Sequence, residues 1–146
     1  MKRKLNFEMI PDGCWKYNLR TILNKRQWEY IRQDAYIRFQ KKCAICGKSL
    51  TKFEAHEVWD YDEKNGIIIL KDVLCLCSAC HKTIHIGHTA LTNFYIQAQN
   101  HYMKVNDVSY AEMIKDMGKA NEIQKRRSLV PEWKMNLEWL RRFVND

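Results

Sequence analysis

The chain has 146 residues and a formal net charge of +8, because 25 Lys and Arg residues outnumber 17 Asp and Glu residues. Apolar residues make up 46% of it, a composition that excludes an intrinsically disordered protein. No apolar run reaches the roughly 18–20 residues that cross a bilayer. No apolar stretch follows the basic start Met1–Lys4 either, so we expect a cytoplasmic protein without a membrane partner. The basic charge suits a nucleic-acid partner, and an ordinary soluble basic surface is equally compatible with it.

The first predicted element is a helix that begins after Asn24. Asn24 and Gln27 have the spacing of a capping box. Apolar residues then recur at helical spacing, at Trp28, Ile31, Ala35 and Phe39. We expect this helix to end near Lys41 and Lys42.

Two runs rich in β-branched and apolar residues follow, over residues 53–59 and 67–76. The segment between them ends in Asn65-Gly66, which is a strong turn signal. These runs predict a β-hairpin. We interpret Asp60 and Asp62 as solvated residues of its turn, and outer-shell partners of a bound metal ion are the alternative.

The second half of the chain is predicted to be mostly helical. Three helices are expected: one capped by Ser78 and ending at Gly87, one around residues 91–98, and one capped by Ser109 with Glu112. The basic run 125–127 and Pro131 should end the helical pattern, and residues 133–143 fit either a strand or a helix. Four tryptophans are interpreted as core residues: Trp15, Trp28, Trp133 and Trp139.

Four of the six cysteines form two Cys-x-x-Cys pairs, Cys43/Cys46 and Cys77/Cys80. Each pair directs two thiolates at one point, and a structural zinc ion takes four such ligands in a tetrahedron. Since the pairs flank the predicted hairpin, a zinc ion bound to all four would join its ends and take no part in chemistry. Unpaired thiols or a redox pair are the alternative. Cys75 is expected to pack as a small apolar residue.

Three histidines are predicted to form a second metal site. His81 and His85 are four residues apart on the short predicted helix, so they share one of its faces. His56 lies on the first strand of the hairpin, which the zinc ion would fold beside that helix. Ordinary surface or core histidines are the alternative interpretation.

These motifs resemble the HNH, or ββα-metal, endonuclease superfamily. The resemblance rests on the cysteine pairs, on His56-Glu57 in the first strand, and on Leu76–His81. Further segments resemble bacterial and phage HNH-like proteins: Cys14-Trp15, Asn18–Arg20, Glu54–Asp62, His81–Gly87 and Trp133–Leu140. The resemblance implies an α+β fold in which a zinc-stapled, treble-clef-like ββα module, residues 43–90, has helical flanks over residues 1–42 and 91–146, all in one compact unit.

The resemblance also implies roles for single residues. His56, His81 and His85 match the ligands of a catalytic Mg²⁺ or other divalent cation, and Glu57 takes the place of the family's general-base histidine. A register shifted by one would make His56 the base, but it would place Ala55 at a metal position. The family's Asn has no clear counterpart, although Asp72 lies near that position. Glu57 would act as a base only if burial or neighbours raise its pKa, and it could instead be a metal ligand.

The function implied by the resemblance is a metal-dependent DNA endonuclease with little sequence preference, in which Glu57, His56 and His81 are catalytic. The alternative is a catalytically decayed, zinc-stabilised module that binds nucleic acid or protein, such as a phage inhibitor or adaptor. The carboxylate at position 57 leaves both open. Four lysines near the first cysteine pair are predicted to contact phosphate: Lys41, Lys42, Lys48 and Lys52. The distal arginine clusters, 125–127 and 141–142, are interpreted as solvated.

Overall fold

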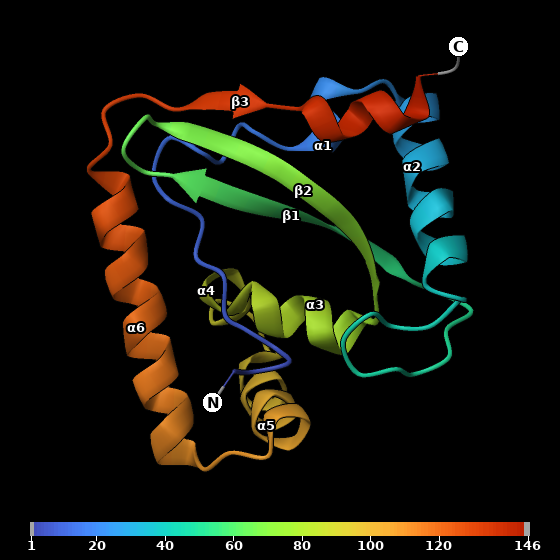
Figure 1. Cartoon of the computed structure of the whole chain (residues 1–146). Helices are drawn as coiled ribbons and strands as arrows, with labels where there is room; N and C mark the ends of the chain where they lie inside the picture. The colour runs from blue at the N-terminus through green and yellow to red at the C-terminus, as the bar shows by residue number, and fades with distance from the viewer. Residues whose placement is uncertain (1, 145–146) are drawn as a thin grey trace.

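The computed structural model describes residues 2–144 and has an α+β fold, as the sequence predicts. A three-stranded sheet of order β1-β2-β3 has helices around it (Figure 1). In chain order the elements are α1 (Leu19–Ile22), α2 (Lys25–Arg38), β1 (Glu54–Asp62), β2 (Ile67–Leu76), α3 (Ser78–Ile84), α4 (Ile86–Thr89), α5 (Tyr95–Asn106), α6 (Tyr110–Ser128), β3 (Lys134–Asn136) and the 3₁₀ helix η1 (Glu138–Phe143).

Helix α2 begins where the sequence predicts and ends earlier. Asn24 Oδ1 accepts a hydrogen bond from Gln27 N at 2.8 Å, and Gln27 Oε1 accepts one from Asn24 N at 3.0 Å, so the capping box is complete. The helix ends at Arg38 rather than near Lys41, because Gln40 and Lys41 adopt left-handed backbone angles with φ of 59° and 61°. Helix α2 packs on β2.

The predicted hairpin is present as β1 and β2, and its turn contacts the C-terminal part of the chain. Gly66 has a φ of 67°, and a Cβ atom at this position would lie 2.6 Å from Glu132 O. Lys134 N donates a hydrogen bond to Gly66 O at 2.8 Å, and from there β3 runs parallel to β2. The sequence of residues 133–143 fits either a strand or a helix, and the structure has both, first β3 and then η1.

Helix α3 is capped by a cysteine instead of the predicted Ser78. Cys77 Sγ accepts a hydrogen bond from Cys80 N at 3.3 Å, which makes Cys77 the N-cap and Ser78 the first helical residue. The helix ends at Ile84, and Gly87 belongs to the separate short helix α4. The cap Cys77, Cys80 of the predicted cysteine group and His81 of the predicted histidine group therefore lie within about one helical turn.

The later helices also differ from the prediction at their ends. Helix α5 begins at Tyr95, and Leu91, which was expected within it, is 84% exposed before it. Helix α6 is capped by Ser109 as predicted, but it continues through residues 125–127 to Ser128. Basic side chains in the last turn of a helix are favourable next to its negative C-terminal dipole, so this basic run prolongs the helix.

One buried cluster joins all three predicted regions of the chain. Leu19 comes from the N-terminal region, Leu76 from the hairpin, and Tyr102 from α5. Phe7 stacks on Tyr102 with ring centroids 4.0 Å apart, so the N-terminal segment is packed against the C-terminal helices. Figure 1 shows this segment passing beneath the hairpin beside α4.

The four tryptophans do not all lie in the core. Trp133 and Trp139 are buried, and Trp28 packs against the main cluster. Trp15 is 61% exposed, contrary to the prediction, because it lies at the wall of an open cavity rather than under a helix. Within residues 2–144, none of the helices is both long enough and apolar enough to span a membrane.

Candidate metal centres

The four paired cysteines converge on one point between the hairpin and α3. Cys43 and Cys46 lie in the loop between α2 and β1, whereas Cys77 and Cys80 lie at the start of α3. Their Sγ atoms all lie within 4.8 Å of one another, and the Cys46 and Cys77 Sγ atoms are 3.7 Å apart. A tetrahedron with zinc–sulfur bonds of about 2.3 Å places its sulfurs about 3.8 Å apart. The group could therefore bind a structural metal such as zinc.

Backbone hydrogen bonds shape the first cysteine turn. Cys43 N donates to Lys48 O at 2.8 Å, and Gly47 N donates to Cys43 O at 3.0 Å. Gly47 has a φ of 79°, which glycine adopts without strain. Ala44 N donates to Cys75 O at 2.8 Å and so fastens this turn to the end of β2. The loop is thus arranged by its backbone as well as by any bound metal.

The two remaining cysteines are inert by burial. Cys75 is fully buried in the core, as predicted, and burial raises the pKa of its thiol to about 11. Burial likewise raises the pKa of Cys14 to about 11. Both thiols are therefore protonated at neutral pH and take no part in the cysteine group.

His101 was missed by the sequence analysis. It lies on α5, and its Nε2 is 3.1 Å from Cys80 Sγ. A ring N–H that donates to a thiolate partly neutralises its charge and helps to fix its position. A single histidine in a helix has no spacing that links it to the cysteine pairs, so the sequence contained no signal for this contact.

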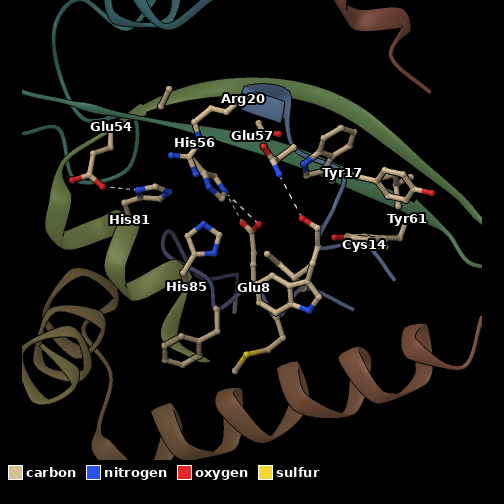
Figure 2. Close-up of a pocket in the computed structure, with 18 of the residues that line it drawn as sticks. Glu8, Cys14, Tyr17, Arg20, Glu54, His56, Glu57, Tyr61, His81 and His85 are labelled. Carbon is tan, nitrogen blue, oxygen red and sulfur yellow. Dashed lines mark hydrogen bonds and ion pairs between the residues drawn. The ribbon is translucent and has the colours of Figure 1, made fainter. Parts of the chain in front are cut away.

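His56, His81 and His85 also meet, and Figure 2 shows their rings facing one another. One ligand nitrogen from each ring lies within 4.8 Å of the other two. The ring centroids are 5.3 Å apart for His56 and His81, 5.1 Å for His56 and His85, and 4.9 Å for His81 and His85. His56 comes from β1, His81 from α3, and His85 from the C-cap of α3.

Carboxylates contact two of the three imidazoles (Figure 2). His81 Nδ1 lies 2.6 Å from Glu54 Oε1, so Nδ1 donates and Nε2 retains its lone pair when the ring is neutral. His56 Nε2 lies 3.3 Å and 3.4 Å from the two oxygens of Glu8. Glu8 N also donates to Ile84 O at 2.9 Å, which holds the N-terminal segment against α3. Glu8 was not identified from the sequence, because nothing local relates it to the distant His56.

The local electrostatics keep two of the rings neutral. Burial, together with the nearby His56 and His81, lowers the pKa of His85 to about 4. Burial also lowers the pKa of His81, although the hydrogen bond with Glu54 partly offsets this effect. Neutral imidazoles are the form that coordinates metal ions, so the geometry and the protonation state agree.

The histidines line an open cavity of about 710 Å³, which also contains Arg20, Glu57 and the exposed Trp15. Arg20 lies on α1 above the rings in Figure 2. Its guanidinium belongs to no ion pair among residues 2–144. A cation that faces a cluster of metal-type ligands without a carboxylate partner is suited to an anionic ligand.

Glu57 lies beside the histidine group and is held by the backbone of α1. Its Oε1 accepts a hydrogen bond from Leu19 N at 2.9 Å. Burial raises the pKa of the carboxyl group, whereas this hydrogen bond and the charge of His56 lower it by smaller amounts. A raised pKa is the property that a carboxylate needs in order to act as a base at this position. The contact with Leu19 also fixes α1, and therefore Arg20, over the cavity.

Several other polar residues have structural contacts instead. Asp72 Oδ1 forms an ion pair with Nη1 of Arg38, a residue of α2, at 3.3 Å. Asp72 does not line the histidine cavity. Asp62 is the last residue of β1 and accepts hydrogen bonds from Asn65 of the turn. Asp60 lies within β1, paired with Ile69, so its predicted place in the turn is wrong. In the distal basic run, Arg126 and Arg127 pair with Glu63 and connect α6 to the hairpin turn: the distances are 2.6 Å and 3.3 Å.

No protein-family model, curated protein or solved structure matches this chain.

Proposed function

We propose that this protein is a metal-dependent DNA endonuclease of the HNH type, which hydrolyses phosphodiester bonds with little sequence preference. The observation that supports it is the convergence of His56, His81 and His85 in an open cavity that also contains the unpaired Arg20. Three protein ligands with one open position are typical of catalytic metal sites, whereas four thiolates are typical of structural ones. The two groups therefore suit two different tasks.

The residues present fit a divalent cation at the histidine group. Two of the three rings are neutral, and carboxylates orient two of them. When bound, such a cation would polarise the scissile phosphate and stabilise the leaving oxygen. Imidazole ligands suit Zn²⁺ or Ni²⁺ better than Mg²⁺, which prefers oxygen ligands, so these two transition metals should support activity better than Mg²⁺.

The remaining side chains of the cavity supply substrate binding and proton transfer. Arg20 would bind a phosphate oxygen, because its guanidinium matches phosphate geometry and forms no ion pair within residues 2–144. Glu57 would accept the proton of the attacking water. Its burial brings its pKa closer to neutrality, which improves a carboxylate as a general base, and its bond to Leu19 N fixes the position of the group.

The four cysteines would hold a zinc ion that joins the loop after α2 to the start of α3. His81 lies in the same short helix as Cys80, and Cys77 caps that helix, so the zinc ion would set the position of His81. Loss of this zinc ion should therefore disturb the histidine group as well as the fold.

A binding module without catalysis is the second candidate. The contact between Glu57 and Leu19 N favours it, because a carboxylate engaged with a backbone N–H can serve solely as an anchor for α1. In that case Arg20 and the basic surface would bind nucleic acid or an acidic protein without hydrolysis.

Nicking of supercoiled plasmid DNA in Mg²⁺, Mn²⁺, Ni²⁺ or Zn²⁺ separates the two candidates. We expect wild type to nick in at least one transition metal, and His81→Ala to be inactive. His88→Ala is the matched control, since His88 is an exposed histidine on α4 outside the group, and this variant should nick like wild type. Absence of nicking by zinc-loaded wild type in all four metals would contradict the endonuclease proposal.

A further inference from the structure

A second hollow, of about 850 Å³, lies beside the cysteine group. It is separate from the histidine cavity, although both use residues of α3: Ser78 and Lys82 line this hollow, whereas His81 and His85 line the other. Cys46 and Cys77 form part of its wall, and so does Phe94, whose ring is 45% exposed. We call this hollow the lysine cavity.

Five lysines line the lysine cavity, and they come from four separate parts of the chain. They are Lys4 of the N-terminal segment, Lys48 and Lys52 of the cysteine loop, Lys82 of α3, and Lys104 of α5. No carboxylate lines the cavity among the described residues, and none of the five ammonium groups forms an ion pair within residues 2–144. Of the four lysines that the sequence predicts to contact phosphate, Lys48 and Lys52 line this cavity. Lys41 and Lys42 do not line it.

Lys82 is the most constrained of the five. Its Nζ donates to Ser78 Oγ and lies 4.7 Å from the centroid of the Phe94 ring. Its charge also acts on the nearby Glu54, which is bonded to His81. The other four lysines are exposed, and within the described part of the chain their ammonium groups form no ion pair, so their charges are available to a ligand.

Like charges that converge in a hollow repel one another and concentrate a positive potential there. Folding brings these lysines together at an electrostatic cost, and that cost falls when an anion binds between them. Closely spaced phosphates suit this arrangement, because duplex DNA has one negative charge per ~1.7 Å of its axis.

We propose that the lysine cavity binds the phosphodiester backbone of nucleic acid, independently of sequence and apart from the histidine cavity. Lysine is a flexible point charge that contacts phosphate without reading bases, so binding here would position the nucleic acid. Since His81 and Lys82 are neighbours on α3, a strand held by the lysine cavity lies next to the histidines. The inference shares its partner with the proposed function, but it needs no hydrolysis.

Binding to a short fluorescent DNA duplex, measured across a range of salt concentrations, tests this inference. All variants include His81→Ala, so that cleavage does not interfere and no chelator is needed. The test variant is Lys48→Ala/Lys52→Ala/Lys104→Ala. The matched control, Lys115→Ala/Lys119→Ala/Lys125→Ala, removes three exposed lysines of α6 and so lowers the formal charge equally, from +8 to +5. Zinc content and circular dichroism check that both variants are folded.

We expect the test variant to bind at least ~10-fold more weakly than the control at low salt. The slope of log affinity against log salt should decrease in magnitude by about 2–3, since each neutralised phosphate contributes about 0.9. Equal losses in the two triple variants would show an effect of net charge only and would overturn the inference. Competition by inorganic triphosphate at the same concentration of phosphate groups as the duplex would overturn it too, because the cavity would then be a small-anion site. A wild-type protein that fails to nick leaves this result unaffected.

Discussion

Two substitutions separate the catalytic role proposed for Glu57 from its structural role. Glu57 Oε1 accepts a hydrogen bond from Leu19 N at 2.9 Å. Glutamine at this position keeps an acceptor oxygen but cannot take a proton from water, whereas alanine removes both functions. We expect Glu57→Gln to lower the nicking rate by about 10²–10⁴-fold, the usual contribution of a positioned general base. This loss corresponds to about 2.7–5.4 kcal/mol of activation free energy.

The two variants should also differ in stability, with Glu57→Gln more stable than Glu57→Ala. Burial raises the pKa of Glu57 above its ordinary value of 4.5, so ionisation is less favourable in the folded protein than in the unfolded one. The corresponding stabilisation is complete below pH 4.5 and is lost as the pH rises through the folded-state pKa. Glu57→Gln has no such charge and should be at least as stable as wild type at neutral pH. Glu57→Ala leaves Leu19 N without its partner, which should cost about 1–3 kcal/mol.

Plasmid nicking in the best-supporting metal and thermal unfolding of the zinc-loaded protein measure the two effects. A Glu57→Gln variant that nicks at the wild-type rate would show that Glu57 only anchors α1, and the assignment of the base would be refuted. A Glu57→Gln variant that is as unstable as Glu57→Ala would refute the reasoning about the hydrogen bond to Leu19.

Three further predictions concern the metal groups and the hairpin turn. Cys43→Ser should lose its zinc ion and most of the fold, since a structural zinc ion contributes ~10 kcal/mol or more to folding. Metal analysis and circular dichroism measure the two losses, and a melting temperature equal to that of wild type would contradict this prediction. Glu54→Gln should weaken binding of Ni²⁺ at the histidine group by about 10–100-fold in calorimetry, because Glu54 fixes the ring of His81. A variant that binds Ni²⁺ as tightly as wild type would show that Glu54 does not orient His81 for metal binding. Gly66→Ala should lower the free energy of unfolding by about 2–4 kcal/mol, since its Cβ would meet Glu132 O at 2.6 Å. Gly118→Ala on α6 is its control and should be neutral or stabilising, because its Cβ meets nothing within 4 Å.

Local patterns in the sequence determined several elements and the membership of both metal groups. The Cys-x-x-Cys spacing, the separation of His81 and His85, and the Asn65-Gly66 turn each act over a few residues. The structure brings together the side chains that these patterns selected. Helix ends were harder to predict, because Cys77 replaced Ser78 as a cap once its sulfur was directed at the α3 backbone.

Only the tertiary structure decided which side chains surround the two groups. Glu8, Arg20 and His101 have no fixed spacing to the residues that they approach, and each arrives on a segment placed by packing in the shared core. The lysine cavity has the same origin, because its charges come from parts of the chain that are far apart in the sequence. Glu57 shows the difference most clearly: the sequence placed it beside His56, but its hydrogen bond to Leu19 exists only because the fold brings α1 to the hairpin. Short-range spacing selects the side chains that cluster, whereas long-range packing sets their orientation, protonation and surrounding charge.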